Sequence, residues 1–297
     1  MALGASALAQ GGGSWQNAAP LPSSRTEVTG AEVAGRLYVV GGFGGGDHVE
    51  AYDPKGDRWE RRASLPASVH HAAAVGIGGR LYVLGGYSGV LWGVLDGVYE
   101  YDPATDRWRE RAPLPTPRGA LAAAAIDGKL YAVGGVGRDR QNTGALEVFD
   151  PAANHWETRP AMPTPRDHHA AGVLEGKLYV VGGRLGGSYS QNLDRHEMYD
   201  PARNAWVTRA PLPTARSGIA AAVLGQRLFV FGGEAPGGTF REVEAYEAAA
   251  DRWTAFAPMP TPRHGLTALA YGGRIHVISG GPRPGGSSSS VNEVFTP

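Results

Sequence analysis

The 297-residue sequence contains no cysteine, which excludes disulfides, thiolate nucleophiles and cysteine metal ligands. Net charge is also lacking: 28 basic residues balance 28 acidic ones, so no overall field favours nucleic acid or an acidic membrane. No apolar run is long enough to predict a membrane-spanning helix. Neither a G-x-x-x-x-G-K-[ST] phosphate loop nor a G-x-S-x-G nucleophile motif occurs. We therefore expect no nucleic-acid partner, no membrane insertion and no cofactor.

A six-fold repeat fills most of the chain. Six tryptophans recur at intervals of 44 to 50 residues, and a glycine doublet begins 26 residues after each of the first five. The tryptophans are Trp15, Trp59, Trp108, Trp156, Trp206 and Trp253. The doublets start at Gly41, Gly85, Gly134, Gly182 and Gly232, and Ser279-Gly280 takes their place in the sixth copy. A period of this length indicates a radially repeated β-structure.

Each repeat encodes four short strands. A run such as residues 36–42 (RLYVVGG) is apolar, rich in β-branched and aromatic residues and ended by glycine, which favours a buried strand. The run before it is built from small residues, as in residues 120–126 (ALAAAAI), and predicts an inner strand at a crowded axis. The third strand ends in an aromatic residue and the fourth carries the tryptophan. The aromatic residues are Tyr52, Tyr101, Phe149, Tyr199, Tyr246 and Phe295.

This pattern resembles the Kelch repeat, through the glycine doublet, the following Tyr-Asp-Pro, the spaced tryptophan and the later Pro-Arg. The resemblance covers roughly residues 14–297 and implies an all-β, six-bladed propeller with four antiparallel strands per blade. The departures are Ser279 for a glycine, Val69 for an arginine and Glu247-Ala248 for Asp-Pro. The chain enters at a fourth strand and ends at a third strand, so we expect the N-terminal strand to close the last blade.

The repeats form one domain, residues 14–297, preceded by a leader, residues 1–13. The repeats run from tryptophan to tryptophan as 15–58, 59–107, 108–155, 156–205, 206–252 and 253–297. In the leader, Ala7-Leu8-Ala9 before Gln10 fits a signal-peptidase site, although a basic start and a full apolar stretch are missing. We interpret it as the end of a secretory signal, which predicts a secreted or periplasmic protein. An ordinary leader and a cytoplasmic protein are the alternative.

An arginine lies ten residues after five of the six tryptophans. In Kelch propellers ligands generally meet the face formed by the loop after the tryptophan strand and the loop after the doublet. The resemblance therefore predicts that these arginines ring one mouth of the channel and bind an acidic peptide or a carboxylate ligand. Alternatively, each arginine satisfies its own turn or pairs with a glutamate of the third strand. The arginines are Arg25, Arg118, Arg166, Arg216 and Arg263, and the glutamates are Glu50, Glu147, Glu197, Glu244 and Glu293.

The positions next to these arginines differ between repeats, and such differences are where a specific function would lie. Candidate acid/base residues are Glu27, His71, Asp167 and His168, and further candidate ligand-binding residues are His70, His264, Phe43, Tyr87, Trp92, Arg184 and Glu234. An ordinary polar lining, with Trp92 capping its own loop, is the alternative. No metal site is expected, because the histidines and carboxylates come from different blades around a wide mouth.

Two functions are compatible with this sequence. The first is a ligand- or protein-binding propeller. The alternative is an enzyme, because a stand-alone six-bladed Kelch ring resembles the bacterial periplasmic sialic-acid mutarotases in architecture. That resemblance implies anomer exchange of N-acetylneuraminate, which requires an acid/base pair and a cation for the carboxylate.

Overall fold

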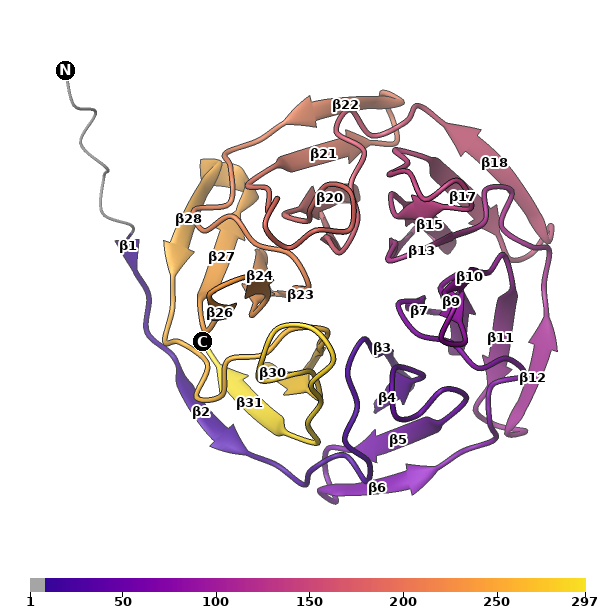
Figure 1. The fold of residues 1–297 in the computed structure, drawn as a ribbon, viewed down its shortest axis with the longest axis horizontal. Coiled ribbons are helices and arrows are strands. Elements are labelled where there is room, and N and C mark those ends of the chain that lie inside the picture. Colours follow the sequence, from indigo (N-terminus) through magenta and orange to yellow (C-terminus); the bar gives the residue numbers. More distant parts are fainter. Residues whose placement is uncertain (1–8) are drawn as a thin grey trace.

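The computed structural model describes residues 9–297, which form a ring of six four-stranded antiparallel sheets around a common axis (Figure 1). The innermost strands line a central channel along this axis. Blades 1 to 3 consist of β3 (Thr29–Val33), β4 (Arg36–Val40), β5 (Val49–Asp53) and β6 (Arg58–Arg61); β7 (Ala73–Ile77), β8 (Arg80–Leu84), β11 (Val98–Asp102) and β12 (Arg107–Glu110); and β14 (Ala122–Ile126), β15 (Lys129–Val133), β17 (Leu146–Asp150) and β18 (His155–Arg159). The predicted all-β, six-bladed fold is confirmed.

Blades 4 to 6 follow the same order from the channel outward. They consist of β19 (Ala170–Leu174), β20 (Lys177–Val181), β21 (His196–Asp200) and β22 (Ala205–Thr208); β23 (Ala220–Leu224), β24 (Arg227–Phe231), β27 (Val243–Glu247) and β28 (Arg252–Ala255); and β29 (Thr267–Tyr271), β30 (Arg274–Ile278), β31 (Asn292–Thr296) and β2 (Ser14–Asn17). Short loop strands are β9 (Tyr87–Ser88), β10 (Gly93–Val94), β13 (Arg118–Gly119), β16 (Val136–Gly137), β25 (Glu234–Ala235) and β26 (Gly238–Thr239). Within residues 9–297 the single helix is the 3-10 turn η1 (Ala248–Ala250), and no helix there could cross a membrane.

Small residues line the axis of the ring, as the alanine-rich runs predicted. The innermost strands contact one another from blade to blade, for example β3 with β7 and β7 with β14. Only side chains of this size fit where six strands converge. The tryptophans lie on the outermost strands, and each indole Nε1 donates a hydrogen bond to a carbonyl oxygen of the chain leading out of the preceding blade; Trp108 Nε1, for instance, lies 2.9 Å from Ala63 O. One repeated side chain therefore joins neighbouring blades.

The sixth blade is closed by the N-terminal strand. Strand β2 pairs antiparallel with β31, with Trp15 opposite Phe295, and the two ends of the ring meet there (Figure 1). The Trp15 ring also contacts Phe231 of blade 5, with centroids 6.1 Å apart. The predicted closure is confirmed. Ahead of it, β1 (Ala9–Gln10) runs parallel to the outer strand β28 of blade 5, while Ala7 and Leu8 of the expected cleavage site lie outside the described residues.

Candidate functional site

The five arginines predicted to ring the mouth lie inside the blades. Their side chains are fully buried, and each pairs with the third-strand glutamate of its own blade. In blade 4, Arg166 Nη1 lies 2.5 Å from Glu197 Oε2, while Nε and Nη2 donate to the carbonyls of Gly182 and Val180. The ligand-binding role predicted for Arg25, Arg118, Arg166, Arg216 and Arg263 is therefore wrong, because no ligand can reach these guanidinium groups. The alternative, internal pairing, describes the structure.

Blade 2, which lacks the arginine, also lacks its glutamate partner. In blades 3 to 6 a threonine two residues before the arginine donates to the same glutamate; Thr164 Oγ1 lies 2.8 Å from Glu197 Oε1. Blade 2 has lost all three polar residues and carries Ala67, Val69 and Tyr99 at the corresponding positions, packed in one apolar cluster. The arginine and the glutamate are thus present together in five blades and absent together in blade 2, as expected for groups that satisfy one another, whereas blade 1 has Ser23 in place of the threonine.

The two loops expected to form the binding face do meet. In each blade the residue after the arginine position pairs as an antiparallel bridge with the residue after the glycine doublet or its equivalent. The pairs are Thr26 with Phe43, His70 with Tyr87, Gly119 with Val136, Asp167 with Arg184, Ser217 with Glu234, and His264 with Gly281. Side chains that are distant in sequence are therefore brought to one end of the channel.

The next residue of each blade forms a backbone ring around the mouth. All six are in the left-handed region, with φ of 55° at Glu27, 55° at His71, 54° at Ala120, 50° at His168, 66° at Gly218 and 60° at Gly265. From blade to blade the N–H of one donates to the carbonyl of the one before, and Val28 N–H completes the circle by donating to Gly265 O. Glycine adopts this conformation without steric cost, whereas Glu, His and Ala are strained in it.

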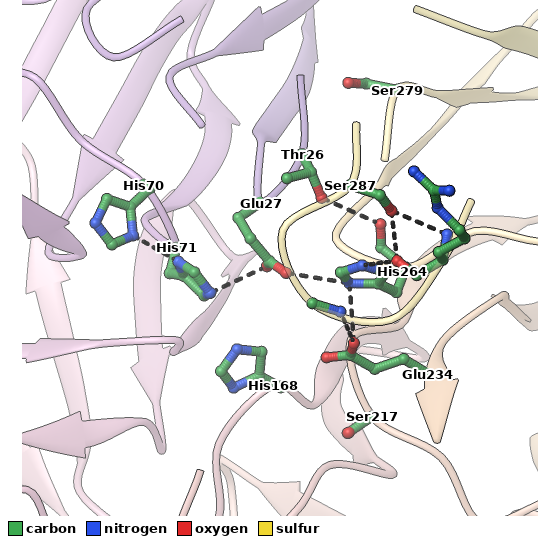
Figure 2. Close-up of polar contacts among 12 residues, drawn as sticks. Thr26, Glu27, His70, His71, His168, Ser217, Glu234, His264, Ser279 and Ser287 are labelled. Carbon is green, nitrogen blue, oxygen red and sulfur yellow. Dashed lines mark hydrogen bonds and ion pairs between the residues drawn. The ribbon is translucent and has the colours of Figure 1, made fainter. Parts of the chain in front are cut away.

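Glu27 lies between two histidines at the centre of the mouth (Figure 2). Its Oε2 lies 3.3 Å from His71 Nε2, and its Oε1 lies 3.3 Å from His264 Nδ1. Burial alone would raise the pKa of Glu27, but His71 and then His264 lower it well below its usual range. Burial lowers the pKa of His71 to about 3, so this imidazole is neutral at pH 7.

The pKa of His264 is raised, whereas that of His71 is lowered. His264 Nδ1 faces Glu27 and, at 3.5 Å, Glu234 Oε2, while its Nε2 lies 3.1 Å from Arg283 O. Both ring nitrogens therefore face acceptors, which suits the protonated imidazolium. Burial alone would lower the pKa of His264, but its hydrogen bond to Glu27 and the charges of Glu27 and Glu234 raise it.

A second polar network joins blade 4 to blade 5. His168 Nδ1 lies 2.5 Å from Asp167 Oδ1, and Arg184 Nη2 donates to His168 Nε2 at 2.8 Å. Arg184 has only donors, so His168 Nε2 accepts and Nδ1–H donates to Asp167. Burial alone would raise the pKa of Asp167, but His168, Asn142 and Arg184 lower it. Arg184 Nη1 also lies 2.7 Å from Glu234 Oε1.

An open cleft lies beside this network. It has a volume of about 750 Å³ and is bounded by the long loop of blade 2, the loop of blade 3 and the loop of blade 4. Tyr87 and Trp92 form one wall, Arg138 and Arg140 another, and Asp167, His168 and Arg184 lie at its inner end. The cleft is therefore basic and aromatic, although its arginines are not those that the spacing predicted.

Trp92 packs against other aromatic rings of the mouth and stays partly exposed. Its ring lies within 6 Å of Phe43, His70, His71 and Tyr87, with centroid distances of 5.8, 5.0, 4.9 and 5.2 Å. It remains 44% exposed, and its neighbours Val90 and Leu91 are 90% and 85% exposed. Phe43 and His70 support this group from behind, stacked 4.1 Å apart, rather than lining the cleft.

Three residues at or beside the cleft, Asn142, Arg138 and Arg140, were not predicted from the sequence. Asn142 Nδ2 donates to Asp167 Oδ2 at 2.5 Å, and the two arginines bound the cleft. All three lie in the loop after the doublet of blade 3, in which no candidate residue was predicted. The cluster Arg138-Asp139-Arg140 within that loop was the available signal.

The expected width of the mouth was also wrong. Glu27, His71 and His168, from blades 1, 2 and 4, bring their donor atoms within 4.8 Å of one another, and so do Glu27, Glu234 and His264. The backbone ring turns these side chains inward, so histidines and carboxylates from different blades converge. The geometric reason for expecting no metal site therefore does not hold.

The fold and its mouth define a six-bladed β-propeller with a polar site at one end of the channel. The model of the KLHDC2/KLHL20/DRC7 Kelch-repeats domain matches residues 64–208 and 121–296, and the Kelch motif matches residues 24–66. The chain therefore belongs to the Kelch-repeat family. The solved structure of YjhT is similar with a TM-score of 0.82 at 18% identity, covering 94% of this chain and 96% of that chain, which shows a shared fold. No curated protein matches the sequence.

Proposed function

We propose that this Kelch propeller binds a small carboxylate-bearing sugar in the cleft beside His168. The observation that carries the proposal is the composition of that cleft. Arg138 and Arg140 supply cations, Trp92 supplies an exposed aromatic face, and Arg184 and His168 supply polar groups at the inner end. Guanidinium groups match a carboxylate, and an aromatic face suits the apolar side of a sugar ring. The volume is in the range of small-molecule sites.

Calorimetric titration with N-acetylneuraminate and with its methyl ester tests this proposal. The acid should bind, and the ester should bind more weakly because it carries no charge for the arginines. Arg138→Ala should weaken binding of the acid by about tenfold, the size of one lost charged hydrogen bond. Arg203→Ala is the matched control, since both arginines are exposed and face an aspartate, at 3.3 Å for Arg138 and 3.7 Å for Arg203. Equal binding of acid and ester, or preferential binding of an acidic peptide, would contradict the proposal.

Anomer exchange of the bound sugar is the second candidate function. The hydrogen bond from His168 Nδ1–H to Asp167 at the border of the cleft favours it, because such a pair can move a proton to or from a hydroxyl group. NMR exchange spectroscopy of the sugar acid measures this activity. Asp167→Asn should slow the exchange while binding persists, and exchange at the uncatalysed rate in the wild-type protein would exclude it.

A further inference from the structure

A group of metal-type donors lies at the mouth of the channel, and one of its members, His168, also borders the cleft described above. Glu27, His71 and His168 surround a cavity of about 80 Å³, and their donor atoms lie within 4.8 Å of one another. Two imidazoles and one carboxylate suit Zn²⁺, Co²⁺, Ni²⁺ or Fe²⁺. We propose that these three side chains bind one divalent transition-metal ion, with open positions facing the channel.

Both histidines are oriented by a partner on the far side of the ring. His71 Nδ1 lies 2.7 Å from His70 Nδ1, and His168 Nδ1 lies 2.5 Å from Asp167 Oδ1. Each partner holds the Nδ1 side of its imidazole, which leaves Nε2 as the second donor atom of each ring, and Figure 2 shows His71 Nε2 pointing towards Glu27. A second hydrogen bond of this kind is what orients metal-binding histidines in general and raises their basicity.

The spacing suits a metal ion after a small adjustment. Glu27 Oε2 and His71 Nε2 are 3.3 Å apart, close to the edge of about 3.4 Å expected for tetrahedral bonds of about 2.1 Å. His264 holds the other carboxylate oxygen, Oε1, so Oε2 is the atom available to the ion. His168 Nε2 becomes available when it gives up its one hydrogen bond from Arg184, which keeps its contacts with Asp167 and Glu234.

The backbone supports the same three positions independently. Glu27, His71 and His168 occupy the left-handed ring conformation, where the chain itself uses glycine in blades 5 and 6. Keeping a donor side chain at such a position costs conformational energy, and strain of this kind clusters at functional sites. The three ring positions with polar side chains are the three proposed ligands.

The neighbouring group Glu27, Glu234 and His264 is a poorer candidate. Glu234 already accepts hydrogen bonds from Arg184 Nη1 and from Gly285 N–H. His264 Nε2 faces the carbonyl of Arg283, and its Nδ1 faces two carboxylates. His264 and Glu234 are engaged in these contacts and do not line the cavity, whereas His71 and His168 do.

Titration of the chelator-treated full chain with Co²⁺ tests the site, read out by calorimetry and by the visible absorption of bound Co²⁺. We expect one ion per chain. His71→Gly and His168→Gly should each weaken Co²⁺ binding by about 100-fold. Loss of a residue that only orients a metal ligand typically weakens binding by about 10- to 100-fold, so the loss of a ligand itself should reach or exceed the top of that range. Ala120→Gly is the matched control, because it makes the same backbone change at a ring position without a donor. It should bind Co²⁺ as the wild type does.

Glycine fits the ring conformation, but the two histidine variants also lose the contacts of their imidazoles, so the melting temperature of each apo variant is measured beside its affinity to show that it folds. Glu27→Gln, which keeps the shape of the side chain, provides a second loss of binding should a glycine variant fold poorly. Absence of stoichiometric Co²⁺ binding by the wild type, or wild-type affinity in both His168→Gly and Glu27→Gln, would overturn the proposal. Neither outcome depends on whether a sugar acid binds.

Discussion

Blade 2 and the other five blades fill the same buried space next to the mouth with different side chains. Five blades bury an arginine–glutamate pair next to the mouth, and four of them add a threonine to it. Blade 2 fills the same space with Ala67, Val69 and Tyr99, and it also carries the loop of the mouth that contains Trp92. The repeated arginine is thus an internal part of a blade, and the residues that follow it supply the polar side chains at the mouth.

Removing one member of a buried pair should have the largest effect. Arg216→Met leaves Glu244 buried without a counter-ion, which should lower the free energy of unfolding by about 3–5 kcal/mol. Urea unfolding followed by tryptophan fluorescence measures the change. A loss below about 1 kcal/mol, the value typical of exposed pairs, would show that the pair is not a structural unit.

The three polar residues of blade 5 can be replaced with the residues found at the same positions in blade 2. Thr214→Ala/Arg216→Val/Glu244→Tyr removes the whole polar group and leaves no charge buried, so it should be less destabilised than Arg216→Met alone. The same unfolding measurement compares the two. A triple variant less stable than the single variant would mean that blade 2 has compensations beyond these three positions.

A second exception lies in blade 4, where His196 stands at the position that Val98 fills in blade 2. Burial lowers the pKa of His196 to about 4. An unfolded histidine titrates near pH 6.5, so between about pH 6.5 and pH 4 the unfolded chain binds a proton that the folded chain does not. The free energy of unfolding therefore decreases as the pH is lowered through this range. His196→Val should remove about 3 kcal/mol of this acid sensitivity.

Thermal unfolding of both proteins at pH 7 and pH 4 checks the His196 prediction. Other buried histidines keep the variant acid-sensitive, so the quantity compared is the difference between the two proteins at each pH. The wild type should lose more than the variant, and identical pH dependence would contradict the assignment.

The smallest effect concerns the backbone ring. Ala120→Gly gives blade 3 the residue type that blades 5 and 6 use at this position, relieving a left-handed alanine at φ 54°. The gain in stability should be about 0.5–1 kcal/mol, reduced by the greater freedom of glycine in the unfolded chain. A clear fall in melting temperature would show that the ring conformation is not strained.

Much of the fold was predictable because every blade repeats the same signals. The tryptophan, the glycine doublet and the alanine-rich run each mark one strand or turn, and the order of strands at the termini specified how the ring closes. The side-chain directions were harder. Spacing places Arg166 near the mouth, but only its partners Glu197 and Thr164 show that it points into the blade. The joint loss of these residue types in blade 2 was a signal in the sequence.

The convergence of Glu27, His71 and His168 could not be predicted from the sequence. It depends on a left-handed backbone at residues that do not favour one, and glycine at the equivalent positions of blades 5 and 6 was the sole hint of it. The cleft was missed for a different reason, since Arg138 and Asn142 lie deep in a loop whose length differs from that of the other repeats.

The division between structural arginines and a ligand-binding mouth is tested most directly by one calorimetric comparison. N-acetylneuraminate is titrated into the wild type, the blade 5 triple variant and Arg138→Ala at neutral pH. We expect the triple variant to bind as tightly as the wild type, although it is less stable, and Arg138→Ala to bind about tenfold more weakly. Loss of binding in the triple variant with unchanged binding in Arg138→Ala would contradict this division.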